Sequence, residues 1–217
     1  RMDMLRTDKL VIPLAAAAFI AALVASGLSC TPKPSPAGQR TFEKGIAYTG
    51  YGGTAYDGNG PLLSLDHLAL TKATWISLLV TAYQDTINST SITFTGPETP
   101  TDSGLERVIQ KARALGLKVM LKPHVDLAND PQHYRGEIGP AFTAADWTAW
   151  FASYRPFILH YASLAARTGC EMFSVGCELG TTAVHAAEWR RVVSEVRAVY
   201  TGPLTYADNQ VESNPNA

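Results

Sequence analysis

The chain has 217 residues, of which 46% are hydrophobic and 17% charged, and its formal net charge is −1. This composition is typical of a globular protein that can bury a core, and it excludes an intrinsically disordered chain. The near-neutral charge argues against a nucleic-acid partner, which would require a strongly basic surface. With only three cysteines in a chain of this length, a disulfide-stabilised scaffold is also excluded.

Residues 1–29 have the pattern of a membrane-targeting signal segment. Basic residues precede the uncharged, alanine-rich run Leu10–Leu28, so the charges stay at the cytoplasmic surface while the apolar helix enters the membrane. Small residues then lead to Cys30, and a Pro- and Ser-rich flexible tether covers residues 30–41. The segment resembles a bacterial lipoprotein signal, in which Cys30 would be lipidated. An uncleaved anchor and a plain secretion signal are the alternatives, and all three place residues 42–217 outside the cytoplasm.

Strand and helix patterns alternate from residue 42 onward. The predicted strands are short apolar runs of the length of buried parallel strands, and they cover residues 45–48, 75–83, 118–122 with an extension to 126, 172–178 and 204–208. The predicted helices have apolar residues at helical spacing, and they cover residues 65–74, 102–115, 143–164 and 189–200. Pro156 is expected to kink the third helix, because proline lacks an N–H and clashes with the preceding turn.

Alternating strands and helices predict an α/β fold with a parallel sheet and right-handed crossovers. An open doubly wound sheet and part of a (β/α)8 TIM barrel both fit this order. The segment Gly50–Gly53 lacks the lysine and the helix start of a phosphate-binding loop, so no cofactor is indicated. This favours an incomplete TIM barrel over residues 42–217 with about five βα units, since a complete barrel needs about 250 residues.

In either architecture ligands bind at the carboxyl ends of the strands. The polar and aromatic residues at or just after the predicted strand ends are Tyr48, Tyr51, Tyr83, Asp85, His124, Asp126, Glu178, Asp208 and Asn209. Rings that stack on a sugar, together with groups that hydrogen-bond hydroxyls, predict a carbohydrate site. We expect substrate contacts from Tyr48, Tyr83, His124, Asp126 and Asn209, although plain packing is an equal alternative for the tyrosines.

His124 and Asp126 admit three interpretations. They can hydrogen-bond sugar hydroxyls, or they can form a structural pair that holds the rim. As a third possibility they can bind a metal ion together with His133, although two histidines and one aspartate are a weak metal-binding signal.

Glu178 ends an otherwise apolar strand. Burial at that position would favour the protonated carboxyl that a general acid needs. The alternative is a structural carboxylate that caps the next helix or pairs with Arg190 or Arg191.

The run Phe173–Gly180, which contains Glu178, resembles the glycoside hydrolase family 113 β-mannanases. The segments Glu188–Arg190, Val196–Arg197 and Tyr200–Ala207 agree with it. The Trp147–Tyr161 helix and the Lys122–Asp126 strand end agree as well, so the resemblance covers about residues 42–210. It implies a retaining (β/α)8 glycoside hydrolase that acts on β-linked polysaccharide or oligosaccharide, of endo-β-1,4-mannanase type, with Glu178 as its acid/base. Many members of the wider clan carry Asn where this chain has Cys177, so a contact to the sugar 2-hydroxyl must come from elsewhere.

The resemblance also implies a nucleophile, a second Glu at the end of strand seven, because retaining hydrolysis needs two carboxyls about 5–5.5 Å apart. Only five strands are predicted here, and Glu212 is not assigned to that role. We therefore expect an N-terminal fragment that is catalytically incomplete. The alternatives are a non-catalytic carbohydrate-binding lipoprotein and a metal-dependent barrel hydrolase that uses His124 and Asp126.

Overall fold

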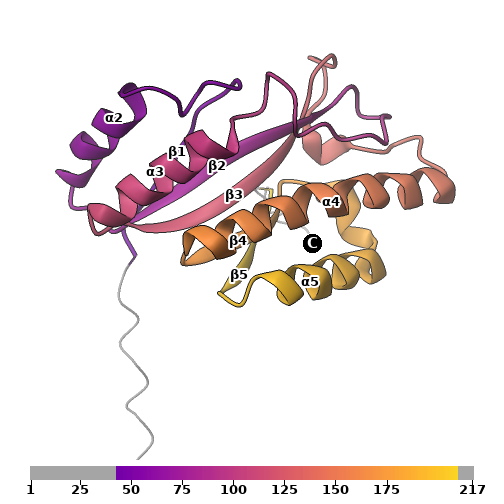
Figure 1. Cartoon of the computed structure of the whole chain (residues 1–217). Coiled ribbons are helices and arrows are strands. Elements are labelled where there is room, and N and C mark those ends of the chain that lie inside the picture. The colour runs from indigo at the N-terminus through magenta and orange to yellow at the C-terminus, as the bar shows by residue number, and fades with distance from the viewer. Residues whose placement is uncertain (1–42, 210–217) are drawn as a thin grey trace, which may run out of the picture. The chain divides into compact units, whose positions relative to one another are not determined.

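A computed structural model gives the structure of residues 43–209; the predicted signal segment, the tether and Cys30 lie outside these residues. Within them the strands are β1 (Gly45–Tyr48), β2 (Trp75–Gln84), β3 (Lys118–Leu127), β4 (Met172–Cys177) and β5 (Leu204–Ala207). The helices are α2 (Gly60–Ala69), α3 (Asp102–Ala114), α4 (Ala144–Thr168) and α5 (Ala186–Val199), and the short 3-10 helices are η1 (Arg135–Glu137) and η2 (Gly180–Val184) (Figure 1).

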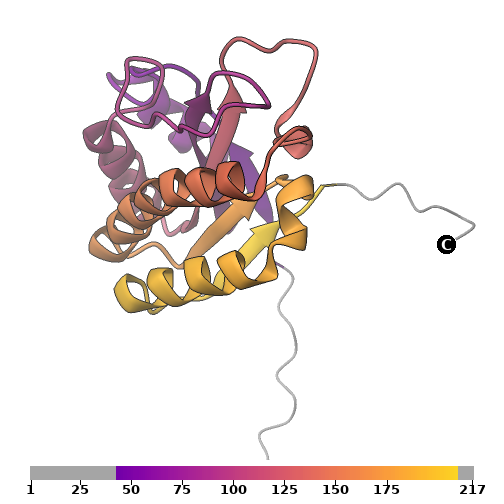
Figure 2. The same cartoon turned by 90° about the vertical axis from the view of Figure 1, so that its right-hand side faces the viewer.

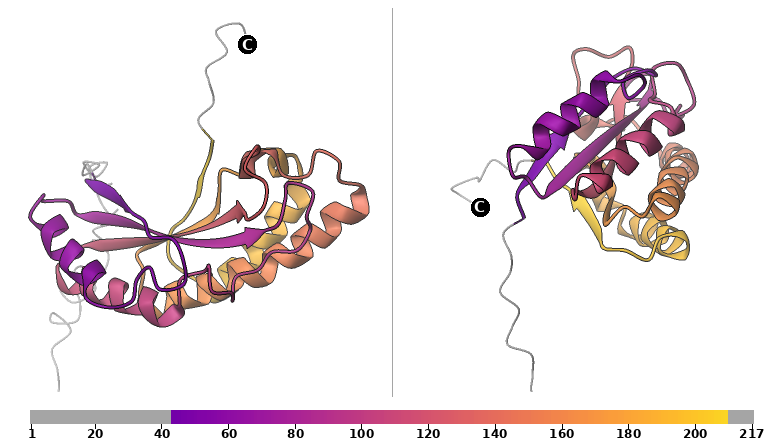
Figure 3. Two further views of the ribbon diagram at one scale, coloured as in Figure 1. Left: turned by 90° about the horizontal axis from the view of Figure 1, so that it is seen from above. Right: turned by 60° about the vertical axis from the view of Figure 1, so that its left-hand side comes forward.

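The five described strands form one parallel sheet in the order β1-β2-β3-β4-β5. Each strand therefore pairs with the next one along the chain, and the order never reverses as it does in a doubly wound sheet. The four α-helices lie against one face of the sheet and follow its curve on the outside, and within residues 43–209 no α-helix covers the opposite face (Figures 2 and 3). This arrangement confirms the predicted incomplete TIM barrel.

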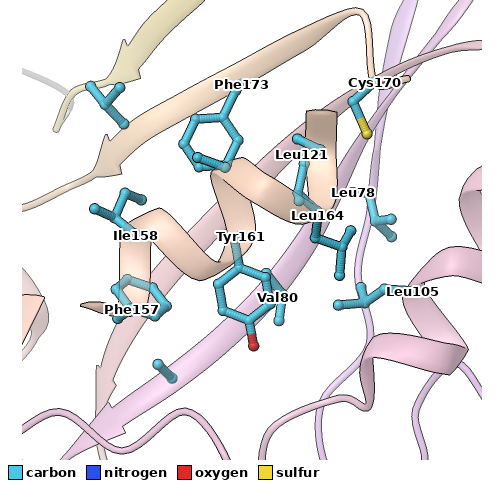
Figure 4. Packing of buried hydrophobic residues seen from close by; sticks show 14 of the residues in the cluster. Leu78, Val80, Leu105, Leu121, Phe157, Ile158, Tyr161, Leu164, Cys170 and Phe173 are labelled. Carbon is cyan, nitrogen blue, oxygen red and sulfur yellow. The ribbon is translucent and has the colours of Figure 1, made fainter. Parts of the chain in front are cut away.

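The core lies between the sheet and the helix layer. Alternate side chains of β2 point toward the helices, and among them Ile76, Leu78 and Val80 are completely buried. α4 packs its own buried side chains against them, as Figure 4 shows for Phe157 and Tyr161. Each such side chain contributes about 1.5–3 kcal/mol by leaving water. This packing fixes the strand ends on which the site is built.

The bounds of α3 agree with the predicted ones to within one residue, whereas α4 runs four residues past its predicted end and α5 begins three residues before its predicted start. α2 differs at both ends. Thr143 and Asp146 form a capping box at the start of α4, which continues through Pro156 and ends at Gly169 in a left-handed conformation. α2 begins at Gly60 instead of residue 65 and ends at Ala69 instead of residue 74, because the proline that follows Gly60 suits the first helical turn. Among residues 43–209, no helix combines the length and the apolar character needed to cross a bilayer.

Candidate active site

The carboxyl ends of β2 and β3 extend beyond β1 and form one side of the candidate site. β1 pairs with β2 only as far as Leu78, whereas β2 and β3 stay paired to Gln84 and Leu127. In this register Thr81 lies beside His124, and Tyr83 lies beside Asp126. The structure therefore brings three of the predicted site residues, Tyr83, His124 and Asp126, to adjacent strand ends.

An arginine from the loop after β3 joins the two candidate carboxylates. Arg135 donates from Nη1 to Glu178 Oε2 at 2.6 Å and from Nη2 to Asp126 Oδ2 at 2.9 Å. Its Nε donates to the Val125 carbonyl at 3.0 Å. The side chains of Arg135, Asp126 and Glu178 are 17%, 33% and 40% exposed. The cluster thus crosses from the end of β3 to the end of β4 at the rim of the sheet.

Glu178 leaves β4 with an unusual backbone conformation. Its φ of 55° lies in the left-handed region, which costs a residue other than glycine about 1 kcal/mol or more. Its N–H donates to the Ala207 carbonyl at 2.8 Å, and the Leu179 N–H donates to the Tyr206 hydroxyl at 2.9 Å. β5 therefore holds the strained turn that aims Glu178 at the rim.

One expectation for Glu178 was wrong, and the ion pair named in the alternative interpretation does not form. We expected a poorly hydrated carboxyl, but 40% of the side chain is exposed, because the residue stands past the last paired position of β4. We considered Arg190 and Arg191 as ionic partners, but the partner is Arg135, and Arg191 pairs with Glu195 at 2.9 Å instead.

His124 is buried beside the cluster and is uncharged at ordinary pH. Burial, the positive charge of Arg135 and that of Lys122 lower the pKa of His124 to about 3. Its Nε2 is buried and has no hydrogen-bond partner among the described residues, and the same holds for Thr81 Oγ1 and Asn209 Oδ1. Buried polar atoms are normally paired, so these three atoms are free to bond a ligand hydroxyl or water.

The other predicted binding residues separate into two groups. Tyr83 lies at the rim, where burial and the negative charge of Asp126 raise its pKa. Asn209 lies next to the segment that follows Glu178, since a Cβ at Gly180 would be 3.0 Å from Asn209 Oδ1. Tyr48 is different: it is buried, and its hydroxyl donates to the Pro61 carbonyl at 2.6 Å.

Tyr48 therefore packs between the sheet and α2. In the register of β1 it pairs with Leu78, which faces the helix layer, and its ring stacks on Tyr56 at a centroid distance of 6.1 Å. The structure thus places Tyr48 away from the other predicted binding residues.

The metal-ligand interpretation finds no matching geometry. His133 pairs with Asp130, with Nδ1 and Oδ1 2.7 Å apart, and not with His124 or Asp126. Within residues 43–209, no group of three or more His, Cys, Asp or Glu side chains is arranged to hold a metal ion. Cys177, at the end of β4, is a free thiol whose burial raises its pKa to about 11.

A large groove lies elsewhere, between α5 and β5. Its volume is about 530 Å³, and its lining includes Val175, Trp189, Val193 and Tyr206. This lining is mostly apolar and offers no pair of catalytic carboxylates. We place the candidate site at the strand ends because the convergent polar groups are found there.

Sequence reasoning missed Arg135. It begins the short 3-10 helix η1, nine residues after Asp126 in the connection between β3 and α4, where neither periodicity nor a motif marks it. The only available signal was a basic residue in the loop that follows two strand-end polar groups. That signal is weak, because most loop arginines are exposed to solvent.

The strand order and the one-sided helix layer define an incomplete (β/α)8 barrel, and the candidate site, the polar cluster, lies at the carboxyl ends of its strands. The sequence profile of Glycoside Hydrolase Family 113 matches residues 47–216. The chain belongs to this family, which confirms the resemblance found in the sequence.

Solved structures of the same family are similar to this chain. A GH113 β-1,4-mannanase is 33% identical with a TM-score of 0.72, and the match covers 80% of this chain and 58% of that chain. The GH113 β-mannanase AaManA from Alicyclobacillus acidocaldarius, solved in complex with ManMIm, is 36% identical with a TM-score of 0.71, and the match covers 79% and 56% of the two chains. The chain thus spans somewhat more than half the length of these mannanases. No curated protein matches it.

Proposed function

We propose that the protein is a retaining glycoside hydrolase that cleaves β-1,4-mannan, with Glu178 as the acid/base. The proposal is supported by membership of Glycoside Hydrolase Family 113 and by the similarity to β-1,4-mannanases. The observation that carries it is the position of Glu178, directly after β4 at the barrel rim and bonded to Arg135 at 2.6 Å. A carboxyl fixed at this rim can reach a glycosidic oxygen of a polymer that lies across the strand ends.

The proposed reaction has two steps. In the first, Glu178 protonates the glycosidic oxygen while a nucleophilic carboxylate attacks the anomeric carbon, so that the leaving sugar departs and a glycosyl-enzyme forms. In the second, Glu178 removes a proton from water, the water oxygen attacks the same carbon, and the nucleophile is released. Two inversions give a product with the original anomeric configuration.

The nucleophile in this proposal comes from outside residues 43–209. Asp126 is the nearest carboxylate in the cluster, but its Oδ2 accepts from Arg135 at 2.9 Å and its Oδ1 accepts from the Leu127 N–H at 3.0 Å. With both oxygens occupied, Asp126 is better suited to hold the cluster and to accept a bond from a sugar hydroxyl.

His124, Tyr83 and Asn209 are the proposed sugar-binding partners of Asp126. The neutral ring of His124 has an unpaired Nε2, and Asn209 has an unpaired Oδ1; both atoms can bond sugar hydroxyls. Tyr83 offers a ring at the rim. We leave Tyr48 out of this group because its ring and its hydroxyl are occupied in the core.

The test is hydrolysis of β-1,4-mannan by the full-length protein, with β-1,4-glucan as the matched polymer. We expect reducing ends to appear with mannan, and proton NMR of the first product to show the β anomer. No hydrolysis of mannan, or an initial α anomer, would contradict the proposal.

We also propose that the protein is exported and anchored to the membrane through a lipid on Cys30. The support is the basic and apolar pattern of residues 1–29 followed by the Pro- and Ser-rich residues 30–41. Mass spectrometry of the mature N-terminus tests this. A diacylglyceryl-modified Cys30 at the first position is expected, whereas an unmodified cysteine or an uncleaved segment would contradict it.

A further inference from the structure

Arg135 uses all three of its guanidinium nitrogens at the rim. Nε is bonded to the end of β3 through the Val125 carbonyl at 3.0 Å, and Nη2 is bonded to Asp126 at 2.9 Å. These two bonds fix the plane of the guanidinium on β3. The remaining nitrogen, Nη1, then points to Glu178 at 2.6 Å. A planar group held at two corners has little freedom at the third.

The charges of the cluster favour this arrangement. Burial disfavours the charged guanidinium, but Asp126 and Glu178 outweigh burial and raise the pKa of Arg135 above its usual value. Asp126 by itself balances the positive charge of Arg135. Glu178 is therefore bonded by a guanidinium whose charge Asp126 already compensates. An acid/base must take up and release a proton, so a compensated partner suits it better than an unpaired arginine would.

Glu178 needs such a partner because little else holds its side chain. Its backbone is fixed by the bond to Ala207, but the carboxyl stands past the end of β4 and is 40% exposed. Among the described residues, Arg135 is its hydrogen-bond partner. Without that bond, the side chain would sample several rotamers.

We propose that Arg135 is the positioning residue of the acid/base. Its bonds to Val125 and Asp126 hold the guanidinium at the end of β3, and its third bond holds the carboxyl of Glu178 in one position. This inference rests on the proposed function of Glu178. Arg135 itself contacts neither the scissile bond nor the attacking water. Its loss therefore reduces catalysis only through Glu178.

The dependence of the rate on the leaving group tests this role. Departure of a poor leaving group needs the proton from Glu178, whereas a dinitrophenolate leaves without it. In the full-length protein, we expect Arg135→Met to lower kcat/KM about 100-fold for mannan oligosaccharides, in line with the cost of misplacing a catalytic group. For a 2,4-dinitrophenyl β-mannobioside we expect a loss of less than about 3-fold in kcat/KM, which reports the first step. A purely structural role would lower both values alike and would contradict the proposal.

Arg167→Met is the matched control. Arg167 also bridges two carboxylates, Asp102 at 3.0 Å and Glu106 at 2.8 Å, but it does so in the helix layer, and both kcat/KM values should stay at the wild-type level. Thermal unfolding checks each variant. If Arg135→Met fails to fold, Arg135→Lys replaces it, because lysine keeps the charge but cannot make the same fixed fork. The same leaving-group pattern with a smaller loss is then expected.

Glu178→Gln separates failure of this inference from failure of the proposed function. If Glu178→Gln shows no leaving-group dependence, Glu178 is not the acid and the proposed function fails. If the loss of kcat/KM depends on the leaving group in Glu178→Gln but not in Arg135→Met, only the positioning role of Arg135 fails. The double variant should be no slower than Glu178→Gln alone, since residues that act as a unit are not additive; an additive loss would contradict the inference.

Discussion

Gln84, the last residue of β2, accepts a hydrogen bond at 2.8 Å from the indole N–H of Trp150 on α4. The other end of its amide donates to the Thr86 carbonyl at 2.7 Å. Gln84 and Trp150 are both buried. This pair therefore ties α4 and the loop after β2 to the strand end beside the site.

Replacement of Gln84 by leucine should destabilise the protein. The indole N–H of Trp150 would lose its partner inside the core, and an unpaired buried donor costs about 1–3 kcal/mol. Urea unfolding of the wild type and of Gln84→Leu measures this difference. In the Trp150→Phe background the same substitution should cost less, because no indole N–H is left unpaired. Equal costs in the two backgrounds would show that the bond contributes nothing.

The backbone strain at Glu178 should reverse the usual order of stability, in which an alanine variant is more stable than a glycine variant. Alanine is normally the more stabilising of the two, because glycine gains more freedom on unfolding. At a φ of 55° the penalty for a Cβ opposes this preference. Both substitutions remove the carboxylate, so the bond to Arg135 cancels in the comparison. We expect Glu178→Gly to be more stable than Glu178→Ala by about 1 kcal/mol in chemical unfolding. A more stable alanine variant would mean that the turn is unstrained.

The buried ring of His124 should make stability depend on pH in the acid range. Its pKa is about 3 in the folded protein, against 6.5 for an unperturbed histidine. Between these values the unfolded chain binds a proton that the folded protein does not, so the free energy of unfolding falls as the pH falls from 6.5 toward 3.

We therefore compare the wild type with His124→Gln, which does not titrate. The wild type should lose more stability than the variant between pH 6.5 and pH 4, by an amount on the order of a few kcal/mol at most. Parallel curves of unfolding free energy against pH would contradict a buried, neutral His124. The carboxylates titrate in both proteins and cancel in the difference.

The pattern of apolar residues predicted the strands of the sheet because most of their side chains are buried, so that each strand is a short apolar run. β1 agrees with its predicted bounds, and β2 and β4 differ from theirs by one residue at the carboxyl end. Periodicity failed at the start of α2, where Gly60 and the following proline were assigned to a loop although proline is favoured in a first helical turn. In the four-residue strand β1, periodicity could not indicate whether the side chain of Tyr48 points to the helix layer or to the opposite face of the sheet.

The site was less predictable than the fold. A residue at a strand end is found by counting along the strand, and that reasoning located Glu178, His124, Asp126 and Tyr83. Arg135 reaches the rim because the connection between β3 and α4, in which it begins η1, returns to the strand ends, and the path of such a connection is not encoded in periodicity. Its charge also decides how Glu178 is held. The burial expected from strand position overestimated how far Glu178 is shielded from water, because the residue stands past the last paired position of β4.

The turnover of mannan by Glu178→Gln in the full-length protein tests the central claim most directly, with Glu106→Gln as its control. Glu106 is also a partly exposed glutamate, 36% against 40% for Glu178, and it is also bonded to an arginine, but it lies on α3. We predict that Glu178→Gln lowers kcat about 10²–10⁴-fold with unchanged thermal unfolding, and that Glu106→Gln keeps the wild-type rate. Wild-type turnover by a folded Glu178→Gln protein would contradict the assignment of Glu178 as the acid/base.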